Sequence, residues 1–125
     1  WGHAADYVRG IWLMLQQDAA DDYVLASGET HTIREFVEIA AEAADFDLEW
    51  SGEGVFETGV DRKTGKTIVK VDPKLYRPAE IDTLIGAASK ARDKLNWNCE
   101  HNLEQLVTNM LRADMDRMER GDRIF

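Results

Sequence analysis

The stretch YVLASGETHTIREFVEIAAEAAD, residues 23–45, decides the fold of this chain because its pattern changes from strand to helix within a few residues. It opens with a β-prone run, residues 23–26, that a Ser-Gly dipeptide stops, as expected for a buried strand ending in a turn. Thr32 is followed three positions later by Glu35, the capping-box pattern of a helix N-terminus. The helix face that follows is apolar: Ile33, Phe36, Val37 and Ala40. The stretch predicts a strand, a turn and a helix.

The segment before this stretch predicts a helix from Ala4 to about Gln17. Its apolar residues at helical spacing are Tyr7, Val8, Ile11, Trp12 and Leu15, and Leu13 and Met14 broaden the stripe. A helix that is apolar on more than one side is normally packed between other elements. We therefore expect this helix to be covered on more than one side.

The remainder of the chain predicts a small sheet followed by two helices. Residues 46–72 contain short β-prone runs around DRKTGK, which has the composition of a turn, so they predict an irregular sheet or hairpin. Residues 83–97 predict a brief strand, a turn at Gly86 and a helix over residues 89–95. A longer amphipathic helix begins at Asn102. Its apolar face consists of Leu103, Leu106, Val107, Met110, Leu111 and Met118.

The composition restricts the classes of partner. A chain of 125 residues with 44% hydrophobic and 31% charged residues is expected to form one domain with a modest core. Its net charge of −9 disfavours binding to nucleic acid or to an anionic membrane surface, because both require a basic face. A small phosphorylated ligand needs only one or two well-placed cations and stays compatible with this charge.

The cysteine content bears on the cellular compartment of the protein, and the first residue bears on whether the chain is a fragment. Cys99 is the single cysteine, so the chain has no internal disulfide, and no apolar run reaches the roughly 20 residues of a membrane span. The cytoplasm is therefore the expected compartment. Trp1 is not a translational start, so we expect a fragment, or a chain whose beginning is missing.

Well-known catalytic and cofactor motifs are absent from the sequence. It contains no GxGxxG or GxxxxGK[ST] phosphate-binding loop, no CxxC or HExxH metal or redox motif and no GxSxG nucleophile elbow. We therefore expect no self-contained catalytic set in this chain.

Each of three smaller groups of residues can be interpreted as functional or as structural. They are Cys99 with His101, the acidic pairs Asp21–Asp22 and Asp114–Asp116, and His3 with Asp6. The first could supply a thiolate nucleophile, the acidic pairs could bind a cation and the last could position a ligand. The structural interpretations are a small residue in a loop, a solvated acidic surface and a cap at the start of the first helix, and these are the ones we favour.

The segment VDPKLYRPAEID, residues 71–82, holds both prolines of the chain. Pro73 and Pro78 fix their own φ angles and restrict the residues before them, so the connector is stiffer than its length suggests. Arg77 is thereby preorganised, and its planar fork suits a phosphate or a carboxylate. A helical turn starting at Pro78 would keep Glu80 near Arg77, where it would suit sugar hydroxyls. Stereochemistry alone also allows a structural ion pair between Arg77 and Glu80.

Five stretches in this order closely resemble the GDP-mannose 4,6-dehydratase family of extended short-chain dehydrogenases/reductases. They are WGHAADYV, IWLMLQQD, YVLASGETHTIREFVE, VKVDPKLYRPAEIDTLIG and SKARDKLNW. The resemblance covers nearly the whole chain and is most specific at the first and fourth stretches. The chain departs from the family where it has GAASKA for GDPTKA and NWNC for GWKP, so that Cys99 replaces a proline.

The resemblance implies an enzyme that converts GDP-mannose to GDP-4-keto-6-deoxymannose and water with a tightly held NADP. The family's NADP-binding fingerprint and YxxxK motif belong to an N-terminal portion and are not in this sequence, so the resemblance implies no catalytic residue, cofactor or metal site here. It assigns substrate binding to Arg77, on the nucleotide's diphosphate, and to Glu80, on the ribose hydroxyls.

Together these observations predict an α/β fold, with residues 1–125 forming a single C-terminal substrate-binding portion of about four helices and a few short strands. Residues 23–26 would lie at the edge of a missing Rossmann sheet. An isolated copy would expose that edge and an apolar face around Ile11, Trp12 and Leu15, which predicts self-association. Its partners would be GDP-mannose or a related nucleotide sugar and the missing N-terminal portion. The alternative is an independent domain that binds a nucleotide sugar or another protein and has no enzymatic activity.

Overall fold

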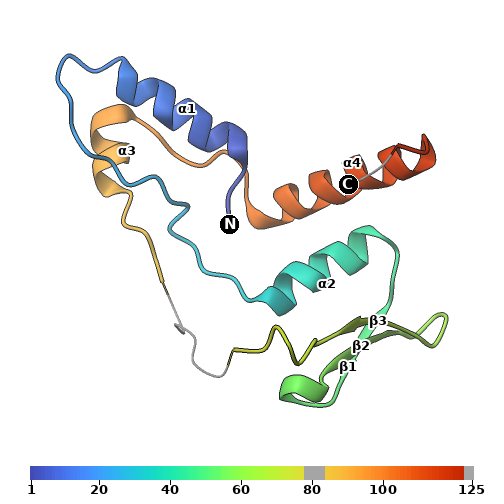
Figure 1. Cartoon of the computed structure of the whole chain (residues 1–125). Helices are drawn as coiled ribbons and strands as arrows, with labels where there is room; N and C mark the ends of the chain where they lie inside the picture. The colour runs from blue at the N-terminus through green and yellow to red at the C-terminus, as the bar shows by residue number, and fades with distance from the viewer. Residues whose placement is uncertain (78–83, 123–125) are drawn as a thin grey trace.

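The computed structural model describes residues 1–77 and 84–122. In these residues the chain forms four α-helices, one 3-10 turn and one three-stranded sheet, which confirms the α/β class. In chain order the elements are α1 (Ala4–Leu15), α2 (Ile33–Ala43), β1 (Leu48–Ser51), η1 (Gly54–Phe56), β2 (Thr58–Asp61), β3 (Lys66–Lys70), α3 (Ser89–Leu95) and α4 (Leu103–Glu119). Figure 1 shows α1 beside α3, and α2 between α4 and the sheet. None of the helices in the described part of the chain has the length and apolar character to cross a membrane.

The first packing centre joins α1 to α3 around Trp97. The Trp97 side chain is buried, and its Nε1 donates a hydrogen bond to the backbone oxygen of Asp6 at 2.7 Å. Gly10 of α1 faces this centre, and a Cβ there would lie 2.5 Å from Cδ1 of Leu25 and 2.9 Å from Nε1 of Trp97. Only glycine therefore lets α1 approach this closely. The rest of the buried cluster is Ala88, Ala91 and Leu95.

The second packing centre joins α2 to α4, and both helices begin with a capping box. Thr32 Oγ1 accepts from the backbone N of Glu35 at 3.0 Å, and Glu35 Oε2 accepts from the backbone N of Thr32 at 2.6 Å, as the sequence predicted. Asn102 and Gln105 form the same reciprocal pair at the start of α4. The buried side chains at this contact are Ala41, Leu103, Leu106 and Val107.

The sheet is antiparallel in the order β1-β2-β3, which confirms the small irregular sheet predicted for residues 46–72. A bulge between Gly59 and Val60 interrupts the pairing of β2 with β3. Trp50 of β1 attaches the sheet to α2, because its Nε1 donates to Glu38 at 2.9 Å and its ring lies under the guanidinium of Arg34. The sheet and α2 therefore form one unit.

The predicted strand over residues 23–26 is not formed. Tyr23, Leu25 and Ala26 pack against the Trp97 cluster, and Val24 is 53% exposed. The three-stranded sheet does not include this run. Gly86 lies close to it, since a Cβ at Gly86 would be 2.5 Å from Cβ of Ala26, but the two segments form no ladder. Residues 84 and 85, the described part of the brief strand predicted before Gly86, form no strand either.

The remaining helix predictions differ in detail from the structure. The helix over residues 89–95 is confirmed as α3, whereas α1 ends at Leu15 instead of Gln17. The expectation that α1 is covered on more than one side is wrong within this chain. Its outer face, Val8, Ile11, Trp12 and Leu15, is between 53% and 77% exposed, because no described element packs on it.

Candidate functional site

The segment that carries Arg77 continues directly from the sheet. After β3 ends, the backbone N of Val71 still donates to the backbone oxygen of Glu57 at 3.3 Å. Antiparallel pairing therefore holds the chain up to the residue before Asp72. The position from which the segment leaves the sheet is fixed by backbone hydrogen bonds.

A closed turn follows, from Asp72 to Leu75. The backbone oxygen of Asp72 accepts from the N of Leu75 at 2.9 Å, and its side-chain Oδ1 accepts from the N of Lys74 at 2.9 Å. Pro73 occupies the second position of this turn, where its restricted φ suits the backbone. The first half of the predicted stiff connector is therefore a side-chain-capped turn.

The turn and the residues beside it line a surface hollow. The lining residues are Val71, Asp72, Leu75, Tyr76 and Arg77. Arg77 is exposed at this hollow and is the last residue of the described range 1–77. Glu80, the second predicted substrate-binding residue, lies outside the described residues, so the pairing of Arg77 with Glu80 stays a prediction.

His3 and Asp6 perform structural tasks at the start of α1. Nδ1 of His3 accepts from the backbone N of Ala5 at 3.2 Å and so caps the helix. The Asp6 carboxylate is 2% exposed and accepts from both the backbone N and Nδ1 of His101, at 3.2 Å and 3.1 Å. The rings of His3 and His101 stack with centroids 4.1 Å apart. Burial raises the pKa of Asp6, but the hydrogen bonds from His101 outweigh it and the net pKa is lowered.

Cys99 is not activated as a nucleophile. Its thiol is half-buried, and that burial, together with the nearby Asp6 carboxylate, raises its pKa. His101, the residue that would have to act as its base, directs Nδ1 at Asp6. A raised thiol pKa leaves little thiolate at neutral pH, so the structural interpretation of Cys99 is favoured.

The acidic pairs serve as partners for basic side chains. Asp21 accepts from Nζ of Lys90 at 2.6 Å and of Lys94 at 3.2 Å, which lowers its pKa to about 2. Asp114 pairs with Arg117 at 3.0 Å. Across residues 1–77 and 84–122, no group of His, Cys, Asp and Glu is arranged to hold a metal ion. The cation-binding interpretation is therefore not supported.

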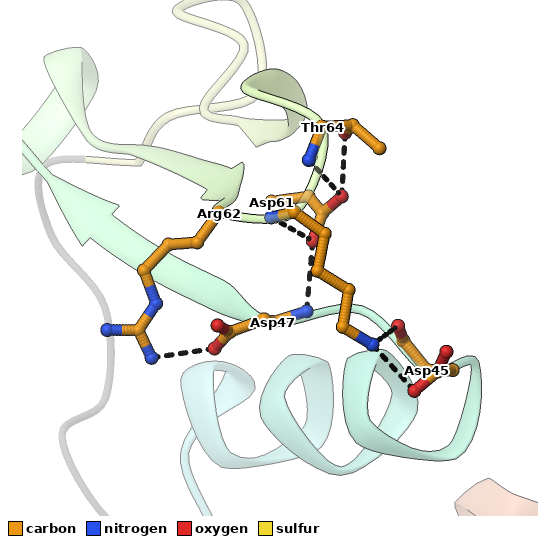
Figure 2. Close-up of polar contacts among 6 residues, drawn as sticks. Asp45, Asp47, Asp61, Arg62 and Thr64 are labelled. Atoms are coloured by element: carbon orange, nitrogen blue, oxygen red, sulfur yellow. Dashed lines mark hydrogen bonds and ion pairs between the residues drawn. The ribbon is translucent and has the colours of Figure 1, made fainter.

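A buried carboxylate that the sequence analysis missed anchors the β2–β3 hairpin, as Figure 2 shows. Asp61 is 1% exposed and accepts from the backbone N of Asp47, the backbone N of Thr64 and the hydroxyl of Thr64, at 3.0, 3.1 and 2.6 Å. The hydrogen bond from Thr64 lowers its pKa, and the bonds from backbone groups act in the same direction. Beside it Lys63 and Arg62 pair with Asp45 and Asp47. The DRKTG turn composition was the available signal, but it did not show that Asp61 points inward.

A protein-family model described as GDP-mannose 4,6 dehydratase matches residues 1–110. The chain belongs to the GDP-mannose 4,6-dehydratase family. The resemblance from the sequence motifs is therefore confirmed. The matched residues include α1, the sheet, the Asp72–Leu75 turn and Arg77.

Individual members of the GDP-mannose 4,6-dehydratase family are similar over almost all of this chain. The GDP-mannose 4,6-dehydratase of Sinorhizobium fredii (strain HH103) is 50% identical over 123 residues, which is 98% of this chain and 35% of that protein. The GDP-mannose 4,6 dehydratase of Drosophila melanogaster is 48% identical over 97% of this chain and 31% of that protein. The human GDP-mannose 4,6 dehydratase is 46% identical over 94% of this chain and 32% of that protein. The chain thus spans about a third of the length of these relatives.

Proposed function

We propose that this chain is the C-terminal, substrate-binding portion of a GDP-mannose 4,6-dehydratase. The complete enzyme would convert GDP-mannose to GDP-4-keto-6-deoxymannose and water. Membership of the family supports this, as does similarity to named dehydratases over a third of their length. The observation that carries the binding role is the capped turn at the end of β3, which leads to Arg77 at an open hollow.

Arg77 would contact the diphosphate and Glu80 the ribose hydroxyls. A guanidinium binds a diphosphate through paired, charge-assisted hydrogen bonds, and the turn before it limits the conformations that must be ordered on binding. The assignment of Glu80 rests on the family resemblance and on its position three residues after Arg77.

The chain would not catalyse the reaction alone. Its sequence has neither the glycine-rich NADP fingerprint nor a YxxxK motif, and its half-buried Cys99 has a raised pKa. The residues present therefore do not fit NADP, which a separate N-terminal portion would hold. That portion would also cover the exposed apolar face of α1. The enzyme portion would be cytoplasmic, and its acidic composition disfavours nucleic-acid and membrane partners.

Calorimetric titration of the chain with GDP-mannose tests the binding role. Arg77→Ala is expected to weaken binding by about tenfold to a hundredfold, because a charge-assisted hydrogen bond contributes about 1.5–3 kcal/mol. The matched control is Arg112→Ala, which removes an exposed arginine from α4 and should leave binding unchanged. Arg34 is unsuitable as a control, because it pairs with Glu57 and lies over Trp50. Equal losses in both variants would overturn the assignment of Arg77.

The alternative is an independent domain without enzymatic activity, and the exposed face of α1 is the observation that favours an interaction role. The encoding reading frame distinguishes the two. A frame that continues upstream through GxGxxG and YxxxK supports the enzyme portion. A frame that begins with Met immediately before Trp1 supports the independent domain.

A further inference from the structure

The hollow beside Arg77 combines both signs of charge with apolar surface. Asp72 contributes a carboxylate and Arg77 a guanidinium, while Leu75 and Tyr76 contribute apolar side chains that are 78% and 50% exposed. A nucleoside diphosphate carries the matching groups: a planar base with hydrogen-bond donors on its edge, and an anionic diphosphate.

The carboxylate of Asp72 has a defined orientation. The residue before it is still paired to Glu57, and its own Oδ1 accepts from the backbone N of Lys74. Its Oδ2 accepts no hydrogen bond from the part of the chain that the structure describes. Each carboxylate oxygen has two lone pairs, so Asp72 can accept from three more donors while the turn stays closed.

Tyr76 is half-exposed and lines the hollow, so its ring can contact a nucleobase. Stacking of a base on an aromatic ring is favourable for any base and therefore confers affinity rather than selectivity. Selectivity requires a polar group beside the ring that matches the donor pattern of one base. Asp72 lines the same hollow and is acceptor-only when ionised.

Guanine offers two adjacent donors on one edge, N1–H and the exocyclic amino group, whereas adenine offers an amino group beside an acceptor nitrogen. A carboxylate accepts from both guanine donors and is repelled by the acceptor of adenine. We propose that Asp72 selects guanine in the nucleotide sugar by accepting from N1–H and the amino group, with the base against Tyr76. This inference rests on the proposed function, because that role sets the diphosphate on Arg77.

Inosine diphosphate is the discriminating probe, because its base keeps N1–H but lacks the amino group. Titrations of the 125-residue chain, followed by NMR, would compare GDP, inosine diphosphate and ADP. We expect GDP to bind about tenfold more tightly than inosine diphosphate, the value of one charge-assisted hydrogen bond, and ADP to bind more weakly still. Asp72→Asn keeps an oxygen that can accept from Lys74 N, so the turn is preserved while the carboxylate is lost.

In Asp72→Asn the preference for GDP over inosine diphosphate should disappear. The control Glu53→Gln removes an exposed carboxylate elsewhere in the same part of the chain and should keep that preference. Equal binding of GDP and inosine diphosphate by the unmodified chain, or an Asp72→Asn variant that still prefers GDP, overturns the role of Asp72 and leaves the proposed function intact. Failure of all three diphosphates to bind overturns the proposed function, and this inference with it.

Discussion

Asp6 shows how a single buried carboxylate joins the two ends of this chain. Asp6 lies in the first turn of α1, yet its carboxylate accepts hydrogen bonds from His101, 95 residues later. Its backbone oxygen accepts from Nε1 of Trp97. The contacts of Asp6 with His101 and Trp97 therefore hold α1 against the loop that precedes α4. Removing the charge leaves the His101 donors with a weaker acceptor in a site that water reaches poorly.

Asp6→Asn is expected to lower the free energy of unfolding by about 1–2 kcal/mol at neutral pH, the cost of weakening a buried hydrogen bond to a charged group. The pKa of Asp6 is below its ordinary 3.8, so its stabilisation is present above that pH and is lost as the pH falls through the lowered value. The difference between variant and unmodified chain, measured by urea denaturation, should therefore shrink as the pH falls below 3.8.

Asp18→Asn, which removes an exposed carboxylate just after α1, provides the comparison. It should leave the free energy of unfolding within about 0.5 kcal/mol of the unmodified value. Loss of stability of similar size in both variants would mean that the Asp6–His101 contact has no special importance.

At the scale of elements, the β2–β3 hairpin positions the candidate site because β3 leads directly into the Asp72–Leu75 turn. The hairpin loop closes around Asp61, which binds Thr64 twice and the backbone of Asp47 once. Gly65 completes the loop with a φ of +70°, a conformation that disfavours other residues. The loop is therefore held by a side chain as well as by the ladder.

Asp61→Ala should accelerate amide hydrogen exchange in β2 and β3 by about tenfold or more, because the backbone N–H groups of Asp47 and Thr64 lose their acceptor. NMR-detected exchange measures this residue by residue. Glu49→Ala, at an exposed acid on β1, should leave the rates unchanged. Slow exchange in the Asp61→Ala hairpin would show that the ladder alone holds the loop.

The lowered pKa of Asp61 implies that the protection of these amides from exchange is also lost as the pH falls below about 3.8.

At the scale of the whole molecule, the outer face of α1 is an apolar surface that none of the described residues buries. Trp12 and Leu15 are 58% and 77% exposed, with Ile11 and Val8 beside them. Figure 1 shows α1 beside α3. Burying one such side chain contributes about 1.5–3 kcal/mol, so covering this face would be strongly favourable.

The isolated chain is expected to self-associate through this face. Light scattering after size-exclusion chromatography should give a mass above the 14.2 kDa of one chain. The double variant Trp12→Glu and Leu15→Glu should return it to a monomer, because burying two carboxylates in an apolar contact is unfavourable. Gln17→Glu, which adds one carboxylate beyond the end of α1, should leave the association unchanged. A monomeric unmodified chain would contradict the prediction.

Patterns that act over three or four residues were predicted correctly. The Thr32–Glu35 capping box, the limits of α3 and the start of α4 after Asn102 all depend on neighbours along the chain. The family was also identifiable from the sequence, because its motifs are contiguous stretches. Arg77 was singled out for its position between prolines, and a closed turn, Asp72 to Leu75, precedes it; the stiffness of the connector stays a prediction.

The sequence by itself therefore determined the helices, the Thr32–Glu35 capping box, the small sheet and the family. Only the tertiary structure decided that residues 23–26 lack a ladder, that Asp6 binds His101 and that Asp61 is buried. The physical reason is the separation along the chain between the groups that interact. A cap or a turn is satisfied by atoms a few residues away, whereas a strand needs a neighbouring strand and a buried carboxylate needs donors brought to it by distant parts of the chain.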